Sequence, residues 1–143
     1  MLIIKTHPME DLTGIKLMNK SNILLMTNSD LDKKQVMLYS LLKESNALIT
    51  DISSVYVDYL LLDRPIGFTV NDMDDYKSGY NVKDPLSLMP GKLINDFSDF
   101  LQFIIDVISG KDIYEEKRIE INALFNKYRD GFSRRITEYF KIT

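Results

Sequence analysis

Residues 47–62 read ALITDISSVYVDYLLL, and this stretch decides the fold that we expect. Its first three residues, 47–49, are a short apolar run, which is typical of a strand buried on both faces. The polar residues 50–54 stand where a helix would begin, and apolar residues then recur at helical spacing. The letters DRP end that helix, and residues 66–70 (IGFTV) indicate a second strand. The pattern predicts a βαβ unit.

The same alternation of strands and helices continues on both sides of this unit. Strands are predicted at residues 2–5, 22–26, 47–49 and 66–70. Besides the central helix, helices are predicted at residues 11–20, 31–45, 97–109, 113–129 and 132–141. We therefore expect an α/β fold, with a Rossmann-like parallel sheet flanked by helices and a helical C-terminal tail. We expect a single domain over residues 1–143, with a sheet core over about 1–95 and helices over 96–143.

The composition excludes several classes of protein. The 143 residues are 45% hydrophobic with a net charge of −3, so no basic stripe for nucleic acid is expected. The sequence has no cysteine and one histidine, which excludes disulfides, thiolate or histidine-rich metal sites and a cysteine nucleophile. No apolar run reaches the ~18 residues of a membrane span and none resembles a signal peptide, so we expect a cytoplasmic location. No cofactor is predicted, and we expect the acidic residues 72–75 to be solvated rather than to bind a cation.

Polar residues follow each predicted strand. They are Lys5-Thr6-His7, residues 27–30 (TNSD), residues 50–54 (TDISS), and residues 71–72 with 76–80. Because the carboxyl ends of parallel strands meet at one edge of a sheet, we expect these groups to line a ligand crevice. Helix N–H groups and serine hydroxyls suit a diphosphate, and a histidine would offset charge as a nucleotide leaves. The residues alone leave open that the 50–54 turn only caps a helix and that His7 has no role.

The order of several motifs resembles one enzyme family. Residues 49–55 (ITDISSV), with Asp58 and DRPI after them, resemble the donor-site signature of the CDP-glycerol glycerophosphotransferases. These are teichoic-acid polymerases and primases and related capsule enzymes, and Ile52 stands where they usually have an aromatic residue. Further matches are Lys5-Thr6-His7-Pro8, an Asp-x-x-x-Tyr and Gly-aromatic pair over residues 72–80, Pro90-Gly91, and a closing motif over residues 126–136.

The resemblance implies a fold and a function. The family fold is GT-B, two Rossmann-like halves with the active site between them, and this chain matches the C-terminal half. It is then expected to be a donor-binding domain, cut from a larger protein or encoded by a truncated gene, that binds CDP-glycerol or a related CDP-polyol. A polymer or lipid-linked acceptor would bind through the N-terminal half, and the full-length protein would lie at the inner face of the cell membrane.

The resemblance also assigns roles to single residues. His7 is expected to be catalytic and to contact the donor diphosphate. Donor phosphates are expected to be bound by Thr50, Asp51, Ser53, Ser54 and Lys77. Lys77 lies beside Ser78, where family members carry an arginine, and it supplies charge without a bidentate fork. Weaker donor contacts are expected from Lys5, Thr27, Asn28, Asp58, Asp72, Tyr76 and Gly79.

Two other functions remain open from the sequence. A GT-B glycosyltransferase that uses a nucleotide-sugar would have a similar crevice. A non-catalytic α/β interaction domain, such as a receiver-like domain, is the other alternative. Against a receiver, Asp51 lacks the N-terminal acidic pair and the late-strand lysine that such a domain needs.

Overall fold

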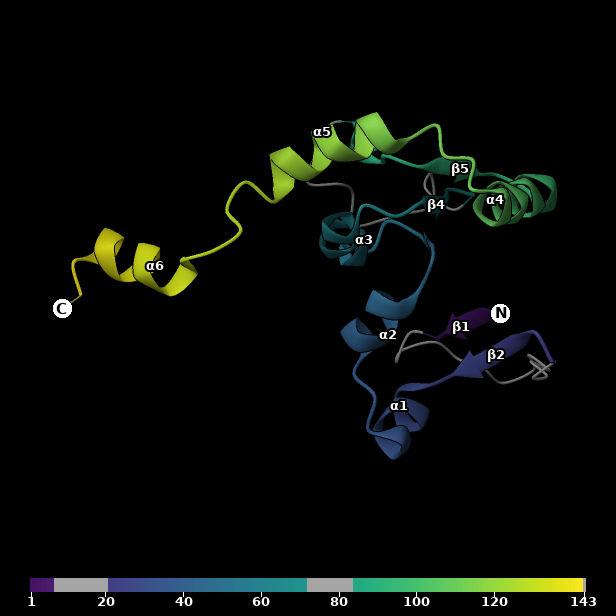
Figure 1. Cartoon of the computed structure of the whole chain (residues 1–143), viewed down its shortest axis with the longest axis horizontal. Coiled ribbons are helices and arrows are strands. Elements are labelled where there is room, and N and C mark those ends of the chain that lie inside the picture. The colour runs from purple at the N-terminus through teal and green to yellow at the C-terminus, as the bar shows by residue number, and fades with distance from the viewer. Residues whose placement is uncertain (7–20, 72–83, 143) are drawn as a thin grey trace. The chain divides into compact units, whose positions relative to one another are not determined.

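The protein has an α/β fold of parallel strands flanked by helices (Figure 1). The computed structural model describes residues 1–6, 21–71 and 84–142. The predicted Rossmann-like class with a helical C-terminal end is therefore confirmed. The chain forms two compact units, Met1–Glu44 and Ser45–Thr143. That the two units act as one donor-binding domain stays a prediction.

The first unit contains two parallel strands, β1 (Leu2–Lys5) and β2 (Ile23–Met26). The pairing aligns Leu2 with Ile23 and Lys5 with Met26. Leu2 N–H donates to the carbonyl of Asn22, and Thr6 N–H donates to that of Met26, so the ladder extends past both strand ends. The predicted helix over 11–20 lies outside the described residues.

Two helices follow β2 where the sequence indicated a polar loop and one long helix. They are α1 (Asn28–Lys34) and α2 (Leu38–Glu44). The first begins three residues early because Thr27 and Asp30 form a capping box. Asp30 N–H donates to Thr27 Oγ1 at 3.2 Å, and Thr27 N–H donates to Asp30 Oδ2 at 2.9 Å.

The break between these helices lies at Gln35, which adopts a left-handed conformation with φ 54°. Its N–H donates to the carbonyl of Asp32, and Val36 N–H donates to that of Leu31. These two bonds satisfy the last carbonyls of α1, as in a Schellman closure, so the helix ends there without a glycine. The prediction of one helix over 31–45 is therefore wrong.

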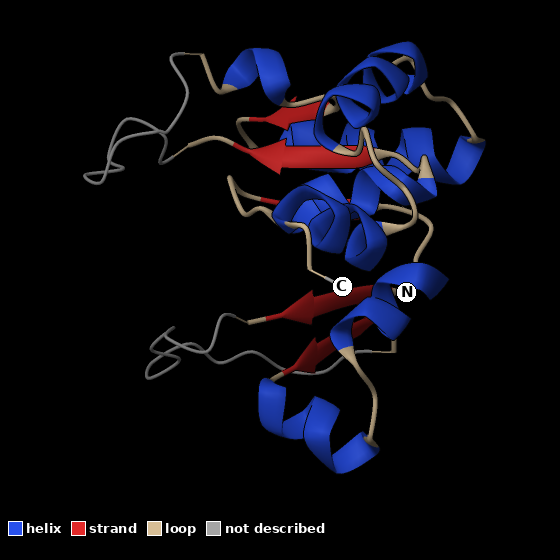
Figure 2. Ribbon diagram, turned by 90° about the vertical axis from the view of Figure 1, so that its left-hand side faces the viewer, coloured by secondary structure: helices blue, strands red, loops and turns tan. Residues whose placement is uncertain are grey.

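The second unit is built on three parallel strands in the order β3–β4–β5, and Figure 2 shows them flanked by helices. They are β3 (Leu48–Thr50), β4 (Ile66–Thr69) and β5 (Lys92–Ile94). The central β4 is the most buried, with Ile66 1% and Phe68 0% exposed. The sequence did not predict β5, which has only three residues, and the four predicted strands form two sheets instead of one.

The chain enters β5 through Pro90-Gly91. A Cβ atom on Gly91 would lie 2.0 Å from the carbonyl oxygen of Ile66, which is far closer than any carbon–oxygen contact allows. Only glycine lets the backbone approach β4 this closely. A 3₁₀ helix, η3 (Leu86–Leu88), precedes this approach.

The central βαβ unit forms as the sequence predicts. Between β3 and β4 lie α3 (Val55–Tyr59) and a 3₁₀ turn, η1 (Leu60–Leu62). Tyr56, Tyr59 and Leu60 are buried, with Tyr59 and Leu60 each 1% exposed. The segment ends at Asp63, which has φ 48°.

Three helices complete the second unit: α4 (Phe97–Ser109), α5 (Glu115–Phe125) and α6 (Phe132–Phe140). The first agrees with the predicted range, because Asp96 caps its start and Gly110, with φ 70°, ends it. The second is shorter than predicted at both ends. Gly131, with φ 62°, separates the last helix from the preceding segment, as the sequence indicated.

Candidate functional site

Polar groups gather at the carboxyl edge of the three-stranded sheet. The strands end at Thr50, Thr69 and Ile94, and polar residues follow each of them. Thr69 Oγ1 donates to the carbonyl of Thr50 at 3.4 Å, and Asn71 Nδ2 donates to that of Asn95 at 2.8 Å. Ligands of parallel α/β sheets bind at this edge, so it is the candidate site of the second unit.

The turn after β3 presents two exposed serines at this edge. Ser53 N–H donates to Asp51 Oδ1 at 2.9 Å, so the aspartate shapes the turn. Ser54 is the N-cap residue of α3, yet its side chain makes no capping hydrogen bond. Ser54 therefore occupies the N-cap position without using its hydroxyl to cap the helix, and a further role for this turn stays a prediction. Thr50, which ends β3, is half-buried, and Asp58 is exposed on α3.

The helix behind this turn is short and is held by aromatic packing. The Tyr56 ring meets the rings of Phe68 and Phe125 edge to face, with centroids 5.2 and 6.2 Å apart. The Tyr59 hydroxyl lies 2.8 Å from Ser45 Oγ. Burial raises the pKa of Tyr59 above its usual value, so this hydroxyl remains neutral across the physiological range.

A buried arginine joins α5 to the end of the α3–η1 segment. Arg118 is 1% exposed; its Nε lies 3.2 Å from Asp63 Oδ1, and its NH2 lies 2.7 Å from Asp112 Oδ2. Burial acts to lower the pKa of Arg118, but hydrogen bonding to Asp112 and the charges of both aspartates raise it overall. Arg64, which follows Asp63, donates through NH1 to the carbonyl of Ser45. Asp63 and Arg64, the first two residues of the DRPI motif, therefore connect the end of the α3–η1 segment to Arg118 of α5 and to Ser45.

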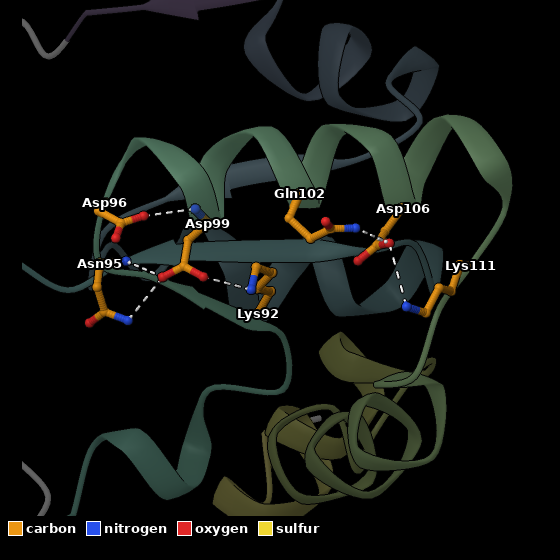
Figure 3. Close-up of polar contacts among 7 residues, drawn as sticks. All are labelled: Lys92, Asn95, Asp96, Asp99, Gln102, Asp106 and Lys111. Carbon is orange, nitrogen blue, oxygen red and sulfur yellow. Dashed lines mark hydrogen bonds and ion pairs between the residues drawn. The ribbon is translucent and has the colours of Figure 1, made fainter.

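The end of β5 adds polar residues that sequence reasoning missed, drawn in Figure 3. Asp99 Oδ1 accepts from Lys92 Nζ at 2.9 Å, and its Oδ2 accepts from Asn95 N–H at 3.1 Å. These bonds, led by the one from Lys92, lower the pKa of Asp99 to about 2. Asp96 Oδ1 accepts from Asp99 N–H at 2.8 Å. An aspartate followed three residues later by another carboxylate is a capping signal that could have located this strand end.

In the described part of the first unit, two of the predicted donor-binding residues, Lys5 and Thr27, have partners within the chain. Thr27 belongs to the capping box of α1: its hydroxyl donates to Asp30 Oδ2 at 2.7 Å. Asn28 is the exposed first residue of that helix. Lys5 Nζ donates to the carbonyl of Thr6 at 2.8 Å. Lys5 pairs with Met26, so Lys5 and Thr27 lie at the same edge of the β1–β2 pair.

Five predicted site residues lie outside the described residues. They are His7, Asp72, Tyr76, Lys77 and Gly79. The acidic cluster at 72–75 lies outside as well. Within the described ranges, no three acidic or histidine side chains come together as a metal site. No helix in the described part of the chain is both long and apolar enough to cross a membrane.

A small cavity lies at the opposite end of the sheet from the serine turn. It is lined by residues at the start of β4 and β5, by one side of α4 and by the α4–α5 connection, including Pro65, Lys92, Phe103 and Asp112. Its position at the amino ends of the strands is not where α/β sheets bind ligands. The polar carboxyl edge remains the better candidate.

Comparison with known proteins identifies the family. Residues 1–140 match the family described as CDP-Glycerol:Poly(glycerophosphate) glycerophosphotransferase. The teichoic acid ribitol-phosphate primase of Bacillus spizizenii (strain ATCC 23059 / NRRL B-14472 / W23) is 35% identical over 98 residues, which are 67% of this chain and 24% of that protein. The teichoic acid glycerol-phosphate primase of Bacillus subtilis (strain 168) is 29% identical over 133 residues, 92% of this chain and 32% of that protein.

A polymerase matches as well. The teichoic acid ribitol-phosphate polymerase TarK of Staphylococcus aureus (strain NCTC 8325 / PS 47) is 29% identical over 90 residues, 62% of this chain and 17% of that protein. The chain therefore spans about a third or less of the length of these relatives. No solved structure gives a significant match. The family match covers every motif of the resemblance, from Lys5-Thr6-His7-Pro8 to residues 126–136, and the chain belongs to the CDP-glycerol:poly(glycerophosphate) glycerophosphotransferase family.

Proposed function

We propose that this chain is the donor-binding part of a transferase that moves glycerol phosphate, or a related polyol phosphate, from a CDP-linked donor to an acceptor in teichoic-acid synthesis. The observation that carries the proposal is the family match over residues 1–140. Capsular polymer is the related alternative product. The domain would be the C-terminal half of a GT-B enzyme, with residues 1–143 acting together on the donor.

In the proposed reaction, an acceptor hydroxyl oxygen attacks the β-phosphorus of the CDP-polyol. The bond from that phosphorus to the bridging oxygen breaks, CMP leaves with the bonding electrons, and the hydroxyl proton passes to a base outside this chain. His7 and Lys77 would neutralise charge on the diphosphate, with weaker donor contacts from Asp72, Tyr76 and Gly79.

The serine turn is the proposed phosphate site within the described residues. Ser53 and Ser54 are exposed at the carboxyl edge, and the side chain of Ser54 is not used for capping. Since α3 has only five residues, its dipole is small, and the hydroxyl and N–H donors of residues 50–54 would carry the binding. Asp51 would act by shaping the turn, and Thr50 would join the donors.

Titration of the chain with CDP-glycerol, followed by NMR, tests this site. We expect amide shifts at residues 51–55, and Ser53→Ala/Ser54→Ala should weaken binding by roughly tenfold. The matched control is Ser98→Ala/Ser133→Ala, which removes two exposed hydroxyls elsewhere. Shifts confined to 72–75 would contradict the phosphate site. Tighter binding of UDP-sugars would favour a glycosyltransferase, and no nucleotide binding would favour an interaction domain.

Catalysis is proposed to need more protein than this chain. Phosphoryl transfer depends on holding acceptor and donor in line, so the isolated chain should bind donor without releasing CMP. In a full-length relative, replacing the histidine that corresponds to His7 by alanine should lower turnover by roughly 10²-fold. Robust CMP release by the isolated chain, or full activity of the histidine variant, would contradict these two points.

Peripheral binding to the cytoplasmic face of the membrane is also proposed, with α6 as the contact. All nine residues of α6 are exposed, and Phe132, Ile136, Tyr139 and Phe140 share one face at helical spacing. The segment 127–141 carries five cationic and two acidic residues, in a chain whose net charge is −3. A basic amphipathic helix of this kind suits an anionic lipid surface.

Co-sedimentation with phosphatidylglycerol vesicles tests the membrane proposal. The chain should sediment with these vesicles and not with phosphatidylcholine, and Ile136→Glu should abolish the association. Ile108→Glu is the matched control, because Ile108 is 80% exposed on α4, outside the basic segment. Equal loss in both variants would contradict a role for α6.

A further inference from the structure

One side chain of the closing motif touches the backbone of α3. Asn126 follows the last residue of α5, and its Nδ2 donates to the carbonyl of Val57 at 2.9 Å. The same Nδ2 donates its second hydrogen to Asn122 Oδ1, also at 2.9 Å. Asn122 is 8% exposed, and Asn126 is half-buried.

The backbone decides which way this amide points. The carbonyl of Val57 is an acceptor only, so the atom of Asn126 that faces it must be the nitrogen. The same nitrogen also faces Asn122, so the atom of Asn122 that accepts from it must be the oxygen. The orientation of the Asn122 side-chain amide is thereby fixed as well. Asn126 is therefore a donor to two acceptors in a defined orientation.

The contact continues to the serine turn through the backbone of one residue, Val57. Val57 accepts from Asn126 through its carbonyl, while Val57 N–H donates to the carbonyl of Ser54 at 3.0 Å. A helix of five residues is too short to be stable alone, so tertiary contacts must hold it in place. Tyr56 packs against the rings of Phe68 and Phe125, and the Tyr59 hydroxyl contacts Ser45, whereas Asn126 meets the backbone of α3 at Val57, the residue that bonds directly to Ser54.

We propose that Asn126 is a positioning residue for the serine turn, acting through the backbone of Val57 to set where Ser53 and Ser54 meet the donor phosphates. It does not touch the ligand itself. The inference rests on the proposed phosphate site and adds a residue from the C-terminal segment to it. The shape of the turn would then depend on the residue that follows α5.

Two isosteric variants separate positioning from stability. Asn126→Asp removes the donor to Val57 and places a carboxylate beside a carbonyl. Asn122→Asp adds the same charge one helical turn away but keeps the acceptor that Asn126 needs. The quantities to be compared are amide exchange rates and amide chemical shifts by NMR, the thermal midpoint, and the Kd for CDP-glycerol. If Asn126→Asp does not fold, Asn126→Ala replaces it in the same measurements, because it removes the donor to Val57 without adding a charge.

We expect Asn126→Asp to raise exchange at Val57 and shift the amides of residues 53–57, and to weaken CDP-glycerol binding by roughly tenfold. The Kd of Asn122→Asp for CDP-glycerol should stay within threefold of that of the parent chain. This should hold even if its thermal midpoint falls as far as that of Asn126→Asp. Equal loss of affinity in both variants, or unchanged exchange at Val57, would overturn the proposal. If the parent chain does not bind CDP-glycerol, the proposed function fails, and the exchange at Val57 still decides whether Asn126 positions the turn.

Discussion

Two polar clusters in the second unit use the same chemistry at different depths. At the α3–α5 junction, which we define by Asp63, Asp112, Arg118 and Asn126, the arginine is 1% exposed. Along α4, the polar row drawn in Figure 3 runs from Lys92 to Lys111 and lies at the surface. Both clusters pair cations with aspartates at hydrogen-bonding distance.

We expect burial, rather than geometry, to decide what such a pair contributes to stability. Lys92 and Asp99 form a 2.9 Å bond with side chains 22% and 29% exposed, so water competes for both partners. Arg118 has lost its water, so its charge depends on Asp63 and Asp112 for stabilisation. The junction should therefore be sensitive to substitution, and the row along α4 should tolerate it.

The largest effect is expected for Arg118→Met, which keeps the apolar stem and removes the guanidinium. Asp63 and Asp112 remain partly exposed, which limits the cost, and we expect the free energy of unfolding to fall by about 3 kcal/mol. Urea denaturation measures this. The control is Arg134→Met, whose side chain is 80% exposed and should change stability little. Equal effects of the two substitutions would contradict the role of burial.

A smaller loss is expected for Asp96→Ala within the polar row along α4. Asp96 accepts from Asp99 N–H and caps the helix, so its removal should lower the free energy of unfolding by about 1 kcal/mol. Ser98→Ala, two residues later in the first turn of α4, is the comparison variant for the same denaturation experiment. A neutral Asp96→Ala would show that the cap is replaced by water.

A still smaller and pH-dependent effect is expected for Asp99→Asn. The pKa of Asp99 is about 2 in the folded chain, against 3.8 for an ordinary aspartate, so its ionised form stabilises the fold. A lowered folded-state pKa gives a contribution that is present above about pH 4 and is lost as the pH falls toward 2. Thermal midpoints of the parent and variant should therefore differ above pH 4 and converge near pH 2. If the difference in thermal midpoint between the parent chain and Asp99→Asn grew as the pH fell, the ionised form of Asp99 would not stabilise the fold, and the prediction would be wrong.

The smallest effect is expected for Lys111→Met at the end of the row. Lys111 Nζ lies 3.7 Å from Asp106 Oδ1, and its side chain is 62% exposed. We expect a change within about 0.5 kcal/mol, and any part of it that comes from the ion pair should become smaller in added salt. Chemical denaturation in low and high sodium chloride measures both quantities. A salt-sensitive loss comparable with that of Arg118→Met would remove the contrast between the two clusters.

Several elements could be predicted from the sequence because their signals are local. The capping Asp96 and the terminating Gly110 lie within or beside α4, and the predicted helix has the observed bounds. The serine turn likewise follows a short apolar strand and precedes its helix, as expected. The split between α1 and α2 was missed because the left-handed residue is Gln35, a type that rarely signals a helix end.

Only the tertiary fold decided other features of the site. β5 has three residues and depends on the close approach of Gly91 to β4, which no pattern within the strand shows. Arg118 looks like an ordinary polar residue in the sequence, and Asn126 stands out only as the first residue of the closing motif, with no sign of its contact to α3. Each becomes structural only when folding brings it to a partner on the central segment.

The sequence by itself determined the family, the α/β class and the serine turn, because these depend on residue types in order and on hydrogen bonds between near neighbours. Which polar side chains would be buried depended on the tertiary structure. Arg118 meets Asp63 across 55 residues, and Asn126 meets Val57 across 69. The strength of a polar contact depends on how much water its partners have lost, and that quantity exists only once distant segments have packed.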